Sequence, residues 1–228
     1  MILCDWESLP ENMKTPAVRP YYDKLRKKRF ALVCKRVFDL VVSAVMLIIL
    51  SPLFLILAAA IKLDSKGPVF YRQKRITQYG REFRIHKFRT MVVDADKIGT
   101  QVTVGADPRI TKMGALLRGC RLDELPQLID IIEGTMSFVG TRPEVPGYVS
   151  AYTDEMMATL LLPAGVTSEA SIRYKDEAEL LAAADDIDKT YIETILPEKM
   201  KYNLDGVRNF SFFGEIATMF RTLIAVIK

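Results

Sequence analysis

The chain has 228 residues, which is enough for one domain of ordinary size plus an accessory element. Half of its residues are hydrophobic although 26% are charged, and the mean hydropathy is +0.12, so we expect the apolar residues to be concentrated in one block. The formal net charge of +4 is too small to indicate a nucleic-acid partner.

Cysteine and histidine content limits the chemistry that the chain can perform. Cys4, Cys34 and Cys120 are far apart and form no Cys-x-x-Cys pair, which argues against a disulfide framework and against a zinc site. The single histidine, His86, cannot form a histidine-based metal cluster, and we expect it to be a packed residue. Any catalysis should therefore depend on carboxylates, arginines and lysines.

An almost wholly apolar segment runs from Val37 to Ile61, with Asp39 as its only charge. It follows a lead-in at residues 1–29 that contains prolines and has no clear period. As a helix the apolar segment would be about 37 Å long, enough to cross the core of a bilayer. It starts too late and is too long for a signal peptide, and a buried core helix would rarely be so uniform. We therefore expect it to reside in a membrane.

Ser51 and Pro52 lie near the middle of this segment. Proline removes one backbone hydrogen bond and forces a kink, and each half would be only about 20 Å long. Basic residues flank both ends, and the positive-inside preference keeps both flanks in the cytoplasm. We therefore expect a re-entrant helix at residues 30–62, broken at Ser51-Pro52, that holds a cytosolic domain at residues 63–228. A single kinked spanning helix is the alternative.

A basic segment follows the apolar one. A turn at residues 65–68, a short β-prone run at 69–71 and an alternating pattern at 83–88 predict strands. Arginines and lysines are dense here, which suits anionic headgroups or a pyrophosphate, or else a solvated basic face. Farther along, a turn at residues 140–144 fixes the backbone beside Arg142, so that its guanidinium can grip a phosphate with two hydrogen bonds.

Two adjacent carboxylates, Asp123 and Glu124, open a predicted helix that ends at Gly134. The N-terminal end of a helix attracts anions, and a carboxylate stays ionised there beside an arginine. The pattern therefore predicts a site where a carboxylate and a bound phosphate share one helix end. Taken alone, the pair is explained better by simple helix capping than by such a site.

The remaining segments indicate more helices. Residues 111–119, 176–184 and 186–203 have helical patterns, the last of them with Pro197 inside it. Residues 207–228 place apolar side chains on one broad face, so they predict either an interfacial amphipathic helix or a helix packed in the core. The expected fold is a mixed α/β, helix-rich monotopic membrane protein, with a Pro-kinked membrane helix and a cytosolic catalytic domain that carries interfacial amphipathic helices.

Six stretches stand together in an order typical of one family. They are Lys35-Arg36-Val37-Phe38-Asp39, Ser51-Pro52, Gly67-Pro68-Val69-Phe70, Lys87-Phe88-Arg89-Thr90-Met91, Asp123-Glu124-Leu125-Pro126-Gln127 and Gly140-Thr141-Arg142-Pro143. Over about residues 30–175 the chain therefore resembles the bacterial sugar transferases that are monotopic polyprenyl-phosphate phosphoglycosyl transferases. Each stretch is weak alone, but the ordered set is specific.

The resemblance implies an enzyme on the cytoplasmic face of the bacterial inner membrane. Such an enzyme transfers a sugar 1-phosphate from a nucleoside diphosphate sugar, usually a UDP-sugar, to undecaprenyl phosphate and releases UMP. The implied mechanism has a covalent aspartyl phosphosugar intermediate and uses Mg²⁺. The reaction is the first membrane step of exopolysaccharide, O-antigen or glycoconjugate synthesis. The implied partners are therefore the two substrates, membrane lipids and downstream glycosyltransferases.

The resemblance also implies a role for each matching residue. Asp123 is the expected nucleophile and metal ligand, with Glu124 as its catalytic partner. The residues expected to hold the substrate or support the site are Lys87, Arg89, Arg118, Arg142 and Pro143, and those expected to break the membrane helix are Ser51 and Pro52. Arg173, beyond the matching stretches, is a further candidate for phosphate contact.

Two positions depart from the family pattern. Thr77 stands where members usually carry glycine, and residues 163–169 keep Gly165-Val166-Thr167 but add Ala164 and replace a final glycine by Ser168. The sugar, the glycan pathway and the oligomeric state therefore stay open. Two rival hypotheses are a non-catalytic membrane-anchored binding protein and a bitopic scaffold of a polysaccharide-export complex.

Overall fold

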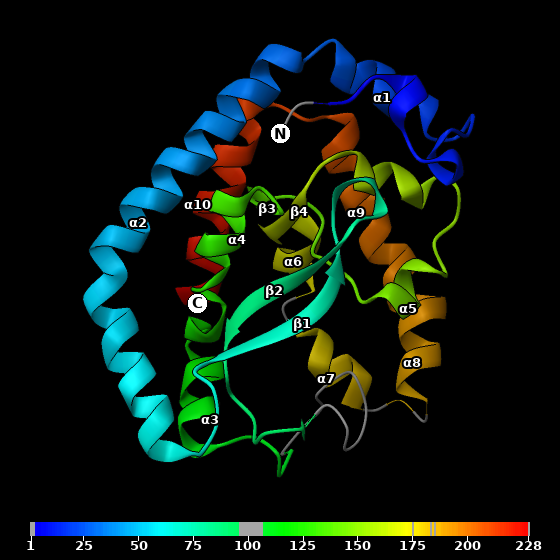
Figure 1. Cartoon of the computed structure of the whole chain (residues 1–228). Coiled ribbons are helices and arrows are strands. Elements are labelled where there is room, and N and C mark those ends of the chain that lie inside the picture. Colours follow the sequence, from blue (N-terminus) through cyan, green and yellow to red (C-terminus); the bar gives the residue numbers. More distant parts are fainter. Residues whose placement is uncertain (1–2, 96–106, 175, 183, 185, 228) are drawn as a thin grey trace.

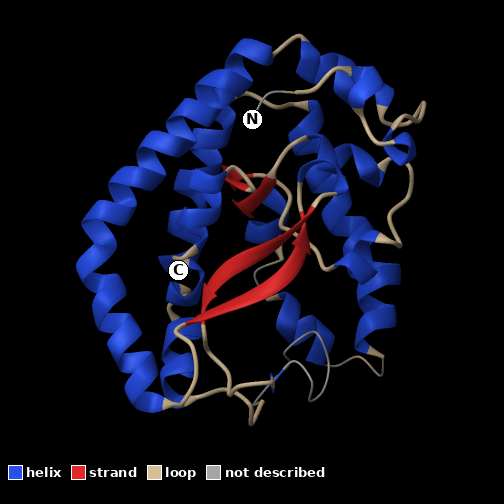
Figure 2. Ribbon diagram, viewed as in Figure 1, coloured by secondary structure: helices blue, strands red, loops and turns tan. Residues whose placement is uncertain are grey.

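The computed structural model describes residues 3–95, 107–174, 176–182, 184 and 186–227, which form a mixed, helix-rich α/β fold (Figures 1 and 2). The strands are β1 (Phe70–Ile76), β2 (Glu82–Phe88), β3 (Met136–Val139) and β4 (Ala164–Thr167). The helices are α1 (Arg19–Arg26), α2 (Arg29–Asp64), α3 (Lys112–Gly119), α4 (Gln127–Glu133), α5 (Pro146–Val149), α6 (Glu169–Arg173), α7 (Glu177–Ala182), α8 (Ile187–Thr190), α9 (Leu196–Arg208) and α10 (Phe212–Ile227).

Helix α2 is the apolar segment that the sequence places in a membrane. It has 36 residues, its most apolar 18-residue stretch has a mean hydropathy of 2.9, and only 11% of that stretch is buried, unlike the core helix of a soluble protein. Among the described residues it is the helix long and apolar enough to cross a bilayer. Figure 1 shows it as a bow whose concave side faces α10, α4 and α3.

The break predicted at Ser51-Pro52 is not a break, because α2 continues through Pro52. Proline has no N–H to donate to the carbonyl four residues earlier, which belongs to Ile48. The hydroxyl of Ser51 donates to that carbonyl instead, at 2.8 Å. The serine thus replaces the bond that the proline removes, and the helix bends without ending.

The concave side of α2 packs on the rest of the fold through two apolar clusters. Val42 and Met46 lie against Leu128, Ile131 and other buried residues of α4, β2, β3 and β4. Nearer its C-terminus, α2 contributes a second cluster of residues, which contains Leu57, Ile61, Phe88 and Leu117. The opposite face of α2 is exposed and apolar along its length, with Val37, Val41, Val45, Ile48 and Ile49 among its residues.

A buried polar network joins the N-terminal half of α2 to β3 and α10. The Nζ atom of Lys35 lies 2.7 Å from Oδ1 of Asp39 and 3.2 Å from Oε2 of Glu215. The hydroxyl of Ser137 donates to Asp39 at 2.8 Å. Arg36 also turns inward and donates to the backbone carbonyls of Ile131 and Ile132. Lys35 and Arg36, the basic pair near the start of the apolar segment, therefore fix the helix on the rest of the fold.

Strands β1 and β2 form an antiparallel hairpin, with Phe70 opposite Phe88 and Ile76 opposite Glu82. Thr77, at the position where the family usually has glycine, follows β1 directly. Its hydroxyl donates to the carbonyl of Thr135 and accepts from the N–H of Ala164 at 3.1 Å. The threonine thus fastens the end of the hairpin to β4 and to the turn before β3.

Strands β3 and β4 are parallel, and the loop after β3 lies directly against β4. A Cβ atom on Gly165 would lie 2.2 Å from the backbone nitrogen of Gly140, which no side chain can tolerate. Gly165, which residues 163–169 keep from the family pattern, is therefore required for this close approach.

The N-terminal segment is more ordered than the sequence suggests. Short 3₁₀ turns at Trp6–Ser8 and Glu11–Met13 lead into α1. The segment fills an apolar cluster with the turn before β4 and with α9; its buried residues include Leu3, Leu9, Met13, Val18, Tyr21, Tyr22 and Leu25. Toward the C-terminus, the helix predicted at 186–203 runs from Ile187 to Arg208 as α8, a π-helical turn at Tyr191–Ile195 and α9, which follow one another without a gap. Pro197 lies in the first turn of α9 and does not interrupt the run.

We expect Lys35→Met to destabilise the protein by about 3–5 kcal/mol, because Asp39 would remain buried without its cation. The side chains of Lys35 and Asp39 are 1% and 0% exposed. Denaturant unfolding in detergent measures the loss. The matched control is Lys74→Met, which removes a pair with Glu82 that is 60% and 53% exposed and should cost less than about 1 kcal/mol. Equal losses in the two variants would contradict the prediction.

Candidate active site

Helix α4 is fixed against the hairpin by a carboxylate on its buried face. Oδ2 of Asp130 accepts a hydrogen bond from the backbone N–H of His86 at 2.9 Å, and Oδ1 lies 2.8 Å from Nδ1 of the same histidine. This arrangement covers the outer edge of β2. It confirms that His86 is a packed residue, and it sets the next residue, Lys87, beside the start of α4.

The two carboxylates occupy a short 3₁₀ turn, Leu122–Glu124, that precedes α4. Arg121 begins this turn in the left-handed region, at φ +56°. In the part of the chain that the structure describes, neither Asp123 nor Glu124 accepts a capping hydrogen bond from the turn or from α4. Simple helix capping therefore does not account for the pair.

Glu124 is held in a two-cation clamp. Nζ of Lys87 lies 2.8 Å from Oε1, and the guanidinium of Arg142 donates to both carboxylate oxygens. Burial alone would raise the pKa of Glu124, but the charges of Arg142 and Lys87 outweigh it and hold that pKa well below its ordinary range. Glu124 is therefore ionised at neutral pH and has both oxygens engaged.

Asp123 differs from its neighbour, because no hydrogen bond or ion pair engages its carboxylate among the described residues. Burial raises the pKa of Asp123 above its ordinary value. The charge of Lys87 opposes this effect, and the charge of Glu124 adds to it. One carboxylate of the pair is thus locked and the other is free to react or to bind a cation.

Asp123 and Glu124 line a cavity of about 610 Å³. Its walls come from β1, from β2 and the segment after it, from the turn before α4, and from the loop after β3. Cationic side chains dominate its polar lining, namely Arg75, Lys87, Arg89, Arg109, Arg118, Arg121 and Arg142. A cavity with this charge suits a polyanion such as a nucleoside diphosphate.

Most of the residues singled out from the sequence meet at this cavity. Nε of Arg118 donates to the hydroxyl of Thr90 at 2.9 Å, and this contact directs the guanidinium along the cavity wall. It depends on Gly114 of α3, where a Cβ would lie 2.0 Å from the carbonyl oxygen of Thr90. Arg142 lines the cavity from the predicted turn at residues 140–144, which follows β3, whereas Pro143 beside it lines a separate small pocket.

Arg89 lines the cavity, but its guanidinium is engaged elsewhere and not with Asp123. That group donates to the carbonyls of Ser65 and Lys66, just beyond the C-terminus of α2. Arg89 therefore ties the membrane helix to the strand that carries Lys87, which agrees with a supporting role.

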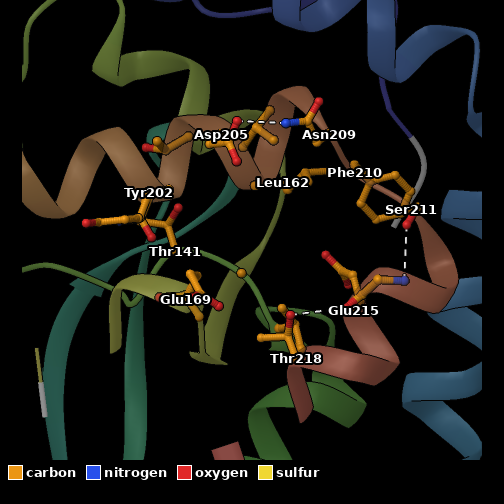
Figure 3. Close-up of a pocket in the computed structure, with 18 of the residues that line it drawn as sticks. Thr141, Leu162, Glu169, Tyr202, Asp205, Asn209, Phe210, Ser211, Glu215 and Thr218 are labelled. Atoms are coloured by element: carbon orange, nitrogen blue, oxygen red, sulfur yellow. Dashed lines mark hydrogen bonds between the residues drawn. The ribbon is translucent and has the colours of Figure 1, made fainter. Parts of the chain in front are cut away.

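Arg173 is not brought to Asp123. It lines a second cavity of about 450 Å³, shown in Figure 3, which lies between α6, α9, α10 and the loop after β3. Its guanidinium lies over the ring of Tyr202 and donates to Glu169 at 3.1 Å. Nothing in these contacts supports the expected contact with a phosphate in the catalytic cavity.

Three cavity arginines escaped the sequence analysis as individual residues: Arg75, Arg109 and Arg121. A signal existed for the first of them. Strand alternation places Tyr71, Gln73 and Arg75 on one face of β1, and Lys87 lies directly opposite Tyr71. Arg75 is therefore on the same face of the hairpin as a residue already assigned to the site.

A carboxylate free in a cationic cavity, beside a long apolar helix, defines a membrane-associated site for phosphate chemistry. Comparison with known proteins agrees with that class. Residues 30–228 match the family described as bacterial sugar transferase. The chain is also 33% identical, over 93% of its length, to the UDP-glucose:undecaprenyl-phosphate glucose-1-phosphate transferase of Escherichia coli (strain K12).

Other relatives are named for exopolysaccharide production or for transfer to undecaprenyl phosphate. The exopolysaccharide production protein ExoY of Rhizobium meliloti (strain 1021) is 31% identical, over 96% of this chain and 91% of that protein. The UDP-N-acetylgalactosamine-undecaprenyl-phosphate N-acetylgalactosaminephosphotransferase of Aeromonas hydrophila is 31% identical over 85% of this chain. The chain spans only 43% and 44% of the Aeromonas and Escherichia proteins. It belongs to the bacterial sugar transferase family.

We expect Glu124→Gln to lower the pKa of Asp123. The substitution removes a neighbouring negative charge and frees the cations of Lys87 and Arg142 to stabilise the ionised form. Carbon NMR of protein labelled at the aspartate carboxyl carbons should show Asp123 titrating at lower pH in the variant than in the wild type. Glu133→Gln, on an exposed position of α4, is the control and should leave the titration unchanged. A raised pKa in Glu124→Gln would refute this electrostatic arrangement.

Proposed function

We propose that the protein transfers a sugar 1-phosphate from a UDP-sugar to undecaprenyl phosphate. The observation that carries this proposal is the unengaged carboxylate of Asp123 in a cavity lined by arginines and Lys87, next to an apolar helix. The names of the relatives in Escherichia coli and Aeromonas hydrophila support both substrates.

In the first step a carboxylate oxygen of Asp123 attacks the phosphorus that bears the sugar. A new Asp123–phosphorus bond forms, the bond from that phosphorus to the bridging oxygen breaks, and UMP leaves with the bridging oxygen and its electron pair. Carboxylates are effective nucleophiles in such transfers, and phosphoryl transfer depends mainly on positioning and on charge stabilisation. Lys87, Arg118 and Arg142 supply that stabilisation.

In the second step an oxygen of undecaprenyl phosphate attacks the same phosphorus. The bond to Asp123 breaks, its carboxylate is regenerated, and the product is an undecaprenyl diphosphate sugar. An ionised phosphate oxygen needs no base to attack. Downstream glycosyltransferases would extend this product into exopolysaccharide, O-antigen or another glycoconjugate.

Glu124 acts in this scheme as a positioning residue and not as a proton acceptor. Its low pKa keeps it ionised, and Lys87 and Arg142 occupy its oxygens. It therefore holds a lysine from β2 and an arginine from the loop after β3 at fixed places around the reacting phosphate.

The site also fits Mg²⁺, the metal of the family. Magnesium prefers one or two carboxylates together with substrate phosphate oxygens, and Asp123 is a free carboxylate directed at a phosphate-binding cavity. When bound, the metal would neutralise part of the diphosphate charge. Asp123 and the donor's own phosphates would hold it.

We further propose that the protein is monotopic, on the cytoplasmic face of the inner membrane. Both ends of α2 are fastened to the same domain: Lys35 near the start contacts β3 and α10, and Asp64 at the end accepts from the N–H of Met113 in α3. A spanning α2 would draw α3, α4 and α10 into the bilayer with it. A bowed α2 lying in one leaflet, with α10 as an interfacial helix that exposes Phe213 and Phe220, avoids this.

Asp123→Asn should abolish UMP release from a panel of UDP-sugars with undecaprenyl phosphate and Mg²⁺, by about three orders of magnitude or more. The amide keeps the shape of the side chain but is a poor nucleophile. Glu133→Gln should retain full activity. Protein quenched during turnover should carry a phosphosugar on Asp123 by mass spectrometry. UMP release by Asp123→Asn at the wild-type rate, or an adduct on another residue, would refute the nucleophile assignment.

Topology is tested by cysteine labelling in a variant whose three native cysteines are serine. Glu11→Cys in the N-terminal segment and Lys201→Cys in α9 both lie at exposed positions. A membrane-impermeant maleimide should label neither cysteine in intact spheroplasts and both after permeabilisation. Labelling of position 11 alone in intact spheroplasts would establish a spanning helix.

A further inference from the structure

A second, apolar opening meets the catalytic cavity at its charged centre. It is a groove of about 560 Å³ that shares Arg121, Glu124 and Arg142 with the cationic cavity. The groove thus reaches Glu124, the neighbour of Asp123, while Asp123 itself lines only the cationic cavity of the two. Two openings of unlike chemistry that meet beside one carboxylate suit a reaction with two unlike substrates.

The walls of the groove come from elements on the membrane-facing part of the fold. Met46 lies on the membrane helix α2, Leu128 on α4 and Phe138 on β3, and Met219 and Leu223 lie on α10. Leu223 lines the groove and is also exposed on the surface of α10. Figure 1 shows α10 running beside α2, and both helices carry exposed apolar side chains, among them Ile48 and Ile49 on α2 and Phe220 on α10.

Gln127 marks the inner end of the groove. Its side chain is 1% exposed, and within the described residues neither its amide nitrogen nor its amide oxygen has a hydrogen-bond partner. A buried amide without a partner costs free energy that a bound polar group recovers. Gln127 lines the groove together with Arg121 and Arg142, so the missing partner is expected at the charged end of an otherwise apolar channel.

We propose that this groove binds the acceptor lipid, with its phosphate between Arg121, Arg142 and the amide of Gln127. The first isoprene units lie along Leu128, Phe138 and Met219, and the chain leaves between α2 and α10 into the bilayer. An anionic head followed by an apolar tail matches the charge at one end of the groove and the apolar surface at the other. The inference rests on the proposed function, and it assigns the donor to the cationic cavity and the acceptor to the groove.

Two neighbours on α10 provide a matched pair of variants. Leu223 and Ile224 are 59% and 55% exposed, but only Leu223 lines the groove. Leu223→Gln should raise the KM for undecaprenyl phosphate about tenfold and leave the KM for the UDP-sugar unchanged. Ile224→Gln should change neither constant. Gln127→Met, which keeps the side-chain volume, should raise the acceptor KM in the same way.

The first half-reaction distinguishes an effect on acceptor binding in the groove from an effect on the chemistry at Asp123. Exchange of labelled UMP into the UDP-sugar, measured without acceptor, should proceed at the wild-type rate in Leu223→Gln and Gln127→Met. Equal effects of Leu223→Gln and Ile224→Gln on the acceptor KM would mean that α10 only contacts the membrane, and would overturn the groove. A rise in the UDP-sugar KM instead would place the nucleotide there and also overturn it.

Direct labelling tests the groove without turnover. A prenyl phosphate that carries a diazirine in its second isoprene unit should crosslink the resting wild-type protein in detergent micelles at Met219 or Val166, and crosslinking should fall in Leu223→Gln. Crosslinks confined to the outer face of α2 would overturn the proposal. Groove crosslinks in a protein that shows no UMP exchange would instead overturn the proposed function and leave the lipid site standing.

Discussion

The clamp of Glu124 by Lys87 and Arg142 is the interaction on which the site depends. It brings together β2, the turn before α4 and the loop after β3, which the chain separates by many residues. Because Glu124 binds these two cations, Asp123 has no partner among the residues that the structure describes, although it remains in the field of both cations. A carboxylate that was itself paired with Arg142 would be a poor nucleophile. The geometry therefore gives the two carboxylates different roles, since Glu124 binds the cations and Asp123 does not.

The clamp in turn needs the membrane helix. Asp130 positions α4 through His86, Arg36 holds the C-terminal end of α4, and Arg89 ties the end of α2 to the strand of Lys87. One hydrophobic cluster joins α2 to α4, and a second joins α2 to β2 and α3. The candidate site and the apolar helix are therefore parts of one packed unit.

Local sequence patterns predicted the parts of the fold that depend on local physics. The apolar segment, the strand at 83–88 and the helix at 111–119 follow from hydropathy and from the strand and helix periods. The ordering of the N-terminal segment did not, because Leu3, Leu9 and Met13 have no period and find their partners only in α9 and the turn before β4. The continuous α2 was also missed, since a proline signals a lost bond but not the serine hydroxyl that replaces it.

The residues of the candidate site also fall into those that local patterns predicted and those that they did not. Asp123, Glu124, Lys87 and Arg142 were found because they stand in short, ordered motifs, whereas Arg109 and Arg121 carry no local signal for the cavity that they line. Arg173 was chosen from its place in the sequence, and its ring contact with Tyr202 could only come from the folded chain. Nearness in sequence to a motif is thus weaker evidence that a residue belongs to the site than a position on the same strand face as a known site residue.

The hydroxyl of Ser51 has a consequence for how the chain enters a lipid environment. A carbonyl that faces hydrocarbon without a donor costs several kcal/mol, and a proline inside a helix ordinarily leaves one. Since Ser51 covers the carbonyl of Ile48 from within the same turn, α2 can curve inside a single leaflet without recruiting water or a neighbouring helix to its bend. The bend at Pro52 therefore needs no hydrogen-bond donor from outside the helix.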